Sequence, residues 1–203
     1  MVRGGENGRG RTTIRGAMAT TMRLTSTQFL EWEGNERHVQ LIDGEVVVNS
    51  PVLRHQTLVV AICAELRAWT LADPGRRGKV AIEVDTRLDE RNVYKPDVWW
   101  RSEPRRPASD ARHLEGPPDL AVEVSSPSTW RYELGLKKAT YERYGLAELW
   151  LVDTDHDLVR VARSSRRRAR GFDVALELGR GEKLTPPQLP GFALDLTALF
   201  DEA

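Results

Sequence analysis

The segment 119–155 constrains the fold of this chain most, because two strand-like runs enclose one helical run. "DLAVEVSS" (119–126) is apolar on alternate residues, "TWRYELGLKKATYERYG" (129–145) has helical spacing, and "AELWLVDTD" (147–155) is again strand-like. Gly145 marks the expected end of the helix. Such a series predicts a sheet that carries a helix on its face.

The residues before this segment predict more of both element types. Asp43-Gly44 is a tight-turn signal between two strands, and Leu58, Ile62 and Leu66 recur at helical spacing. The expected elements are a short helix from "TSTQFLEW" (25–32) capped by Ser26 or Thr27, a hairpin in 38–50, a long helix in 50–75 ended by Pro74-Gly75, strands at 79–88 and 93–100, and a polar loop at 102–118. Interleaved strands and helices with an antiparallel hairpin predict an α/β (mixed α+β) fold with a mixed central sheet flanked by helices.

The composition fits one globular domain, and its charge balance by itself indicates no particular partner. Lys plus Arg and Asp plus Glu number 30 each, so the net charge does not indicate a nucleic acid or an anionic membrane. The single cysteine, Cys63, excludes an internal disulfide and fits a reducing compartment. No apolar run approaches the roughly 18 residues of a membrane span, and no apolar segment of a secretory signal follows the basic N-terminus. The expected location is therefore the cytoplasm, without membrane contact.

The first 24 residues differ from the rest of the chain. They are rich in Gly, Arg and Thr and have no apolar periodicity, which predicts a disordered basic tail at 1–24 and a single domain at 25–203. Met18 or Met22 is an alternative to Met1 as the true start.

Three acids stand in strand-like, half-buried contexts. Asp97 follows a proline inside "VYKPDVWW", Glu123 shares a strand face with Ala121, and Glu45 opens the second strand of the hairpin. An unpaired charge in such a place is costly, so each carboxylate needs a partner. If their strands are adjacent, Asp97 and Glu123 can converge on one Mg²⁺-type cation. The alternative, about equally open from spacing alone, is that each carboxylate pairs with an arginine.

Lys137 adds a cation to this set. Leu134, Lys137, Tyr141 and Tyr144 are spaced by three and four residues, so Lys137 is expected on the inward face of its helix. A lysine on an inward face needs a carboxylate or a phosphate nearby. The alternative is a side chain whose methylenes cover apolar surface while the ammonium reaches solvent.

Several motifs together resemble a known family. They are "LIDGEVV", "SPVLRHQ", "RLDERNVYKPDV", "GPPDLAVEVSSPSTWRYELGLKKATYERYGLAELWLVD" and "LPGFALDLTALF", between Thr25 and Phe200. In this combination and order they resemble the Uma-two family of restriction endonucleases, a branch of the PD-(D/E)XK nuclease superfamily. The resemblance implies a restriction-endonuclease-like fold with its active site where two strands diverge.

The resemblance also implies roles for individual residues. Asp97 corresponds to the aspartate of the PD motif, Glu123 to the acid of the following strand, and Lys137 to the lysine. The superfamily's common form has its lysine two residues after the second acid, where this chain has Ser125, whereas the Uma branch takes it from the next helix. Glu133 stands where the family leads us to expect an aspartate.

Two further positions match the family and also have plain structural readings. Glu45 resembles the first acidic position of the family, which implies a role in the cation shell. The alternative is that Glu45 is only an exposed hairpin residue. His55 begins the inward stripe of its helix, where it either serves catalysis or phosphate contact or is a satisfied core histidine.

The implied function is a Mg²⁺-dependent (or Mn²⁺-dependent) endonuclease that hydrolyses phosphodiester bonds, with DNA as the expected substrate. A nuclease acting on RNA and a catalytically silent nucleic-acid-binding or assembly module on the same fold stay open. Exposed apolar residues favour a homodimer. The arginine cluster, Arg166, Arg167, Arg168 and Arg170, is expected on a hairpin tip, where it grips phosphates or is simply solvated.

Overall fold

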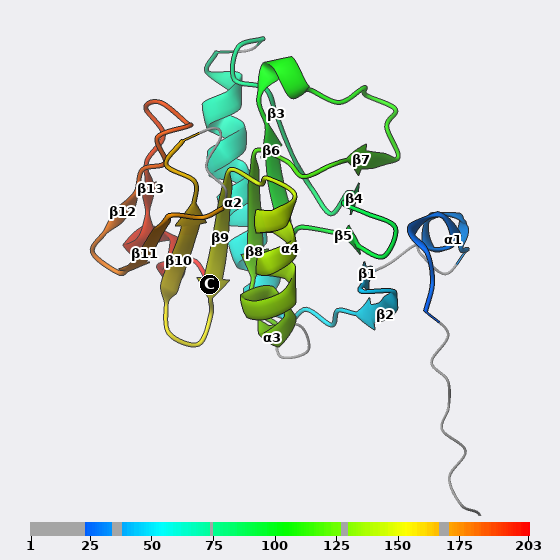
Figure 1. Cartoon of the computed structure of the whole chain (residues 1–203). Coiled ribbons are helices and arrows are strands. Elements are labelled where there is room, and N and C mark those ends of the chain that lie inside the picture. Colours follow the sequence, from blue (N-terminus) through cyan, green and yellow to red (C-terminus); the bar gives the residue numbers. More distant parts are fainter. Residues whose placement is uncertain (1–22, 34–37, 74, 127–129, 167–170) are drawn as a thin grey trace, which may run out of the picture.

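The computed structural model describes residues 23–33, 38–73, 75–126, 130–166 and 171–203 (Figure 1). Residues 1–22 of the predicted tail at 1–24 lie outside the described residues. The other residues named in the predictions that lie outside them are Pro74, Arg167, Arg168 and Arg170. Arg23 and Leu24 contact the first hairpin. The side chain of Arg23 donates to Asp43 at 2.7 Å and the backbone N–H of Leu24 donates to the carbonyl of Gly44 at 2.9 Å.

A mixed six-stranded sheet forms the centre of the molecule (Figure 1). Strands β8 and β9 run parallel, and every other neighbouring pair in this sheet is antiparallel. The predicted mixed sheet is therefore confirmed. In sheet order its strands are β11 (Val174–Gly179), β10 (Leu158–Arg163), β9 (Glu148–Asp153), β8 (Leu120–Val124), β6 (Val98–Arg101) and β3 (Lys79–Ile82).

A second sheet of five short strands lies beside the first (Figure 1). It contains the predicted hairpin, whose turn residues Asp43 and Gly44 have φ of 48° and 80°, as a tight hairpin turn requires. Its strands in order are β2 (Glu45–Val48), β1 (Val39–Ile42), β5 (Val93–Tyr94), β4 (Asp85–Arg87) and β7 (His113–Glu115), and a separate ladder joins β12 (Lys183–Leu184) to β13 (Leu194–Asp195).

Helices cover both faces of the central sheet (Figure 1). The long helix α2 (Leu53–Leu71) packs on one face, and the segment made of α3 (Trp130–Tyr132), the π-helical turn η2 (Glu133–Lys137) and α4 (Lys138–Arg143) packs on the other. The remaining helices are α1 (Ser26–Glu31), the 3₁₀ turn η1 (Glu103–Arg105) and α5 (Leu196–Asp201). No described helix is long and apolar enough to cross a membrane.

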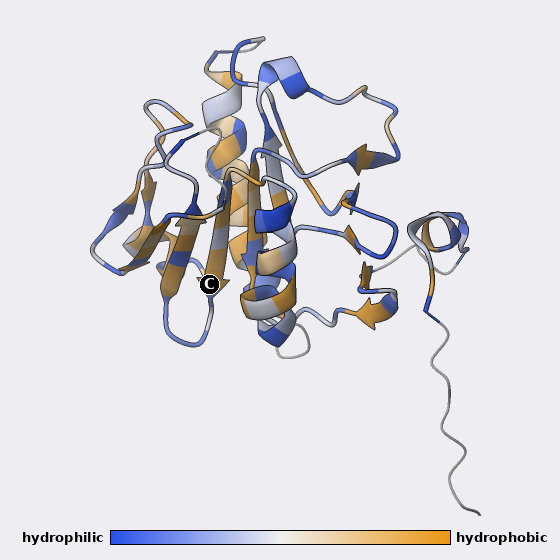
Figure 2. Ribbon diagram, in the orientation of Figure 1, coloured by the Kyte–Doolittle hydropathy of each residue, from blue (hydrophilic) through white to orange (hydrophobic). Residues whose placement is uncertain are grey.

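Strand alternation divides the interior into two main apolar clusters. On β8, Leu120, Val122 and Val124 pack in the cluster of α2, whereas Ala121 packs in the cluster of α4. Figure 2 shows that orange, hydrophobic residues predominate along the central strands. The faces predicted from the sequence for this strand are confirmed, and they place the side chain of Glu123 on the α4 side with Ala121.

Several expected elements differ in detail. The N-cap of α1 is Thr25, which accepts a hydrogen bond from the N–H of Gln28 in a capping box, so the expected cap at Ser26 or Thr27 is wrong by one or two residues. The expected loop 102–118 contains η1 and β7. The runs 79–88 and 93–100 are each divided between the two sheets, as β3 and β4 and as β5 and β6. Alternation alone does not reveal such a change of sheet.

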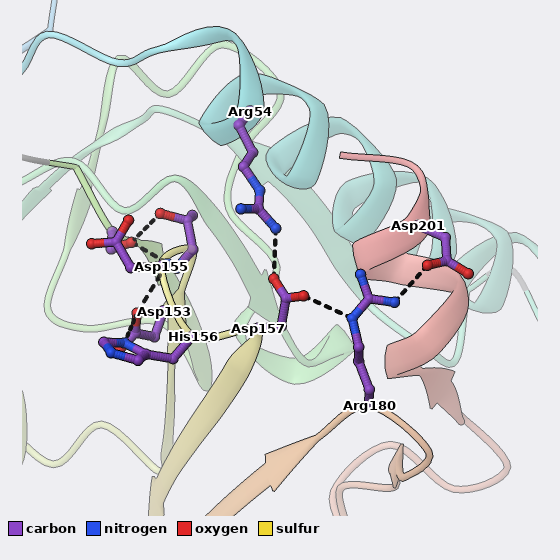
Figure 3. Close-up of polar contacts among 9 residues, drawn as sticks. Arg54, Asp153, Asp155, His156, Asp157, Arg180 and Asp201 are labelled. Carbon is purple, nitrogen blue, oxygen red and sulfur yellow. Dashed lines mark hydrogen bonds and ion pairs between the residues drawn. The ribbon is translucent and has the colours of Figure 1, made fainter.

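A chain of ion pairs joins α2 to the C-terminal helix (Figure 3). Asp157 accepts from Arg54 of α2 and, at 2.7 Å, from Arg180, which also donates to Asp201 of α5. Burial works against the charged carboxylate, but the Arg180 hydrogen bond and the charge of Arg54 hold the pKa of Asp157 below its usual value.

We expect Asp157→Asn to lower the free energy of unfolding at neutral pH, by an amount that disappears in acid. A carboxylate with a lowered native pKa stabilises the fold above its unfolded pKa of about 4, and this stabilisation is lost as the pH falls through the native value. Urea unfolding of both proteins over a pH series measures the difference, with Asp155→Asn at an exposed neighbouring acid as the control. A difference that stays constant with pH would contradict this assignment.

Candidate active site

Asp97 lies where the chain passes from the second sheet to the central one. It directly precedes β6, whose Val98 pairs with Val122 of β8, so the register continued by one residue sets Asp97 beside Glu123. The N–H of Val124 donates to Asp97 Oδ2 at 2.7 Å. The sequence prediction that Asp97 and Glu123 converge required their strands to be adjacent. β6 and β8 are adjacent, so the two carboxylates come from neighbouring segments.

Lys137 joins this pair from the helical segment that follows β8. Its Nζ lies 2.8 Å from Glu123 Oε2, and the hydroxyl of Tyr141 donates to Glu123 Oε1 at 2.9 Å. The side chains of Lys137 and Glu123 are almost wholly buried, at 1% and 2% exposure. Both oxygens of Glu123 therefore have a protein partner, and the expectation that the Lys137 ammonium reaches a carboxylate rather than solvent is met.

The π-helical turn decides which residues of this helix face inward. Glu133, Lys137 and Tyr141 are buried, whereas Leu134 and Tyr144 of the expected inward stripe are exposed. A π turn holds more residues than an α turn, so it rotates the following residues relative to an ideal α-helix. Residues four apart then share the inward face, and the prediction that Leu134 and Tyr144 lie on it is wrong.

Two tyrosines hold the buried ion pair in place. Tyr94 and Tyr141 pack edge to face with ring centroids 5.2 Å apart, and the Lys137 ammonium lies 5.5 Å from the centroid of the Tyr94 ring. The Tyr94 hydroxyl donates to Asn92 Oδ1 at 3.0 Å. Sequence analysis did not identify Tyr141 as the hydrogen-bond donor to Glu123, although its place four residues after Lys137 was a usable signal.

Burial dominates the electrostatics of these groups. It raises the pKa of Glu123, with Lys137 opposing and the nearby Asp97 and Glu133 adding to the rise. For Lys137, burial favours the neutral amine, but Glu123 and Glu133 outweigh it and raise the pKa of the ammonium. Lys137 therefore keeps its proton and compensates a surrounding group of carboxylates.

His55 is buried at the start of α2 and faces Asp97. Its Nε2 lies 3.3 Å from Asp97 Oδ2, and its side chain is 1% exposed. Burial alone would lower the pKa of His55, but Asp97, Glu133 and Glu83 raise it above its usual value. The inward position expected for His55 is correct, and a protonated imidazole there stabilises the Asp97 carboxylate.

Asp97 also borders a small polar cavity. The cavity has a volume of about 10 Å³, which is room for one water-sized group. Its walls come from the β1–β2 hairpin of the second sheet and from the segments that cross between the two sheets. Its lining residues are His38, Gln40, Asn49, Glu83, Lys95 and Asp97. Of these, the sequence prediction named only Asp97 as part of a site.

The other predicted site residues lie apart from this group. Glu45 is exposed at the hairpin turn, 4.0 Å from Arg23, while Asn49 beyond the other end of β2 borders the cavity. Glu45 and Asn49 are four residues apart along this extended segment, which corresponds to about 13 Å. Glu45 therefore lies away from the cavity at Asp97. Arg166 is exposed, and Arg167 and Arg168 lie outside the described residues.

The carboxylate oxygens of Asp97 and Glu123 are suitable donor atoms for a Mg²⁺-type ion. Carboxylate oxygens are the ligands this ion prefers, and it commonly uses one or two of them together with water and substrate phosphate. Asp97 borders the cavity, and Glu123 is its neighbour. No group of three or more His, Cys, Asp or Glu that could hold a metal occurs within the described part of the chain, so a fit depends on those two acids and on ligands from outside the protein.

Comparisons with known proteins identify the family of the chain and support its fold. A family model named Uma2, with the description "Putative restriction endonuclease", matches residues 26–197. A solved structure described as "a putative nuclease belonging to DUF820" from Anabaena variabilis superposes with a TM-score of 0.75 over 88% of this chain and 98% of that chain. The two sequences are 18% identical, so this likeness concerns the fold. Among curated proteins, no relative matches the chain.

Proposed function

The chain belongs to the Uma2 family, and on this premise we propose that it is a metal-dependent endonuclease that hydrolyses phosphodiester bonds of DNA. One observation carries the proposal: Asp97, Glu123 and Lys137 come from three separate segments that a strand ladder and a 2.8 Å ion pair bring together, and Asp97 borders a polar cavity. A nuclease of this fold needs two acids and one cation at a common point.

Asp97 and Glu123 are the residues that would hold a Mg²⁺ or Mn²⁺ ion. Such an ion, when bound, lowers the pKa of a water and offsets the negative charge that builds on the phosphoryl oxygens. Lys137 opposes the rise that burial causes in the pKa of Glu123 and orients that carboxyl group, and its positive charge favours the developing anion. His55 supports Asp97 from the side of α2. In this scheme none of these side chains forms a covalent intermediate.

The test is cleavage of three substrates by the purified protein. We expect it to nick supercoiled plasmid DNA when Mg²⁺ or Mn²⁺ is present and to stop when EDTA removes the metal. Parallel reactions with single-stranded DNA and with RNA decide between DNA and RNA as the substrate. If none of the three is cleaved with either metal, the proposed activity is wrong.

The near-complete burial of the site favours one alternative, a nucleic-acid-binding or assembly module that uses its acids structurally. Glu123 is 1% exposed and both of its oxygens already have protein donors. Titration calorimetry with Mn²⁺ separates the two functions. Binding that is lost in Asp97→Asn supports the nuclease, and nucleic-acid binding without Mn²⁺ binding supports the module.

A further inference from the structure

The cavity beside Asp97 contains a second lysine with no role in the scheme above. Lys95 lies two residues before Asp97 and borders the same cavity, and its side chain is 11% exposed. Its Nζ lies 3.5 Å from Asp85 Oδ1, and its backbone N–H donates to Gln40 Oε1 at 3.1 Å. The backbone of Lys95 is therefore fixed to β1 and its ammonium lies beside β4, both in the second sheet.

The two lysines differ in what they can reach. Lys137 is 0% exposed, lies 2.8 Å from Glu123, and is covered by the ring of Tyr94. A ligand entering the cavity therefore meets Lys95 before it meets Lys137. The distance of 3.5 Å to Asp85 is also longer than that of a strong charged hydrogen bond, so Lys95 retains capacity to donate to an anion.

The cavity combines hydrogen-bond donors with carboxylates. Lys95 carries an ammonium, and the side-chain amides of Gln40 and Asn49 add neutral donors, because their oxygens already accept from Lys95 N–H and from Ser126 Oγ. Asp97 and Glu83 supply the negative charge. These groups fit an oxyanion that binds together with a divalent cation. The ammonium of Lys95 then compensates the oxyanion and the carboxylates compensate the cation, so no charge is left unpaired.

The backbone at the cavity wall is held in an uncommon conformation. His38 and Glu83 have φ of 43° and 48°, in the left-handed region, and their side chains lie 3.7 Å apart. The N–H of Glu83 donates to the carbonyl of Pro96 at 3.2 Å, which ties the crossing between β3 and β4 to the residue before Asp97. Strained residues of this kind persist where the surrounding structure fixes them, so the cavity walls are well defined.

From these observations we infer that Lys95 binds a non-bridging oxygen of the substrate phosphate, with the amides of Gln40 and Asn49 as additional donors. The volume of about 10 Å³ accommodates a single oxygen-sized group, which is what one phosphate oxygen requires. This inference rests on the proposed nuclease function and assigns the phosphate contact to Lys95 rather than to Lys137. Lys95 is then a substrate-binding residue.

The test compares Lys95→Met with Lys95→Arg and with Lys183→Met, a control at an exposed lysine of β12. Binding of a fluorescent DNA duplex is measured by anisotropy in Ca²⁺, and KM and kcat are measured for plasmid nicking in Mg²⁺. We expect Lys95→Met to weaken binding about tenfold and to reduce the slope of log K against log salt by about one, because one phosphate contact is lost. Lys95→Arg should retain most of the affinity, and Lys183→Met should match the wild type.

Asp85→Asn distinguishes substrate binding from a structural ion pair. If Lys95 serves only to pair with Asp85, then Asp85→Asn and Lys95→Met will weaken DNA binding equally, and the inference is wrong. It is equally wrong if Lys95→Met binds DNA with the affinity and salt slope of Lys183→Met while the wild type cleaves DNA. A wild-type protein that neither binds nor cleaves nucleic acid would overturn the proposed function itself, and this inference with it.

Discussion

Replacing Asp97 by Asn is expected to lower the rate of metal-dependent DNA cleavage about 10³-fold or more, because the change removes the negative charge that would bind the cation. The side chain of Asn keeps an oxygen that can accept from the N–H of Val124, which Asp97 now does at 2.7 Å. Asp97→Ala lacks that oxygen and would leave a buried N–H without its partner, at a cost of about 1–3 kcal/mol in the free energy of unfolding. Asp97→Asn is thus the cleaner test of chemistry.

The measurement is initial-rate nicking of plasmid DNA by matched preparations of the wild type, Asp97→Asn and Asp110→Asn. Asp110 is an exposed acid in the loop before β7, so its replacement controls for the loss of one negative charge. Urea unfolding verifies that Asp97→Asn remains folded. Full activity in Asp97→Asn would show that this residue does not serve the reaction and that the site must be sought elsewhere.

Lys137→Met is expected to have the largest effect on stability, about 3–5 kcal/mol in the free energy of unfolding at a pH above the native pKa of Glu123, because there it leaves the carboxylate of Glu123 buried without its ion-pair partner. Methionine has a similar length, so little of the effect comes from a cavity. Burial already raises the pKa of Glu123, so the carboxyl of the variant can bind a proton. The loss should therefore be small in acid and increase as the pH rises through the native pKa of Glu123, since a raised native pKa stabilises the fold only below it.

Two companion variants identify the cause of that loss. Lys138→Met changes the neighbouring, partly exposed lysine and should stay within about 0.5 kcal/mol of the wild type. The double variant Lys137→Met with Glu123→Gln removes both charges, so it should regain at least half of the lost stability while staying inactive in plasmid nicking. Urea unfolding at several pH values measures all of them. If Lys137→Met and Lys138→Met are equally stable at every pH, the buried ion pair does not stabilise the fold.

Much of the fold was predictable because local patterns record which face of an element is buried. The alternation in "DLAVEV" placed Glu123 on the face of Ala121, and helical spacing predicted the buried Leu58, Ile62 and Leu66 of α2. Asp43-Gly44 predicted the hairpin because few residue pairs tolerate two positive φ angles. Each of these signals depends on neighbours within a few residues.

The candidate site was predictable in part, and through motifs more than through physics. Family resemblance pointed to Asp97, Glu123 and Lys137, and register and helix packing set them together. Spacing alone did not separate this arrangement from acids paired with arginines. Lys95, two residues before Asp97, was not recognised as a site residue, because the run 93–100 was read as one strand and the change of sheet at residues 95–97 was missed.

The sequence by itself determined the order of elements, their buried faces and the family, because short-range periodicity and ordered motifs carry that information. Only the tertiary structure decided that the π turn brings Lys137 and Tyr141 onto Glu123, and that the second sheet places Lys95, Glu83 and Asn49 around the cavity at Asp97. These contacts join residues far apart in the chain. Whether such residues meet depends on how sheets cross and pack, and no local pattern of side chains specifies this.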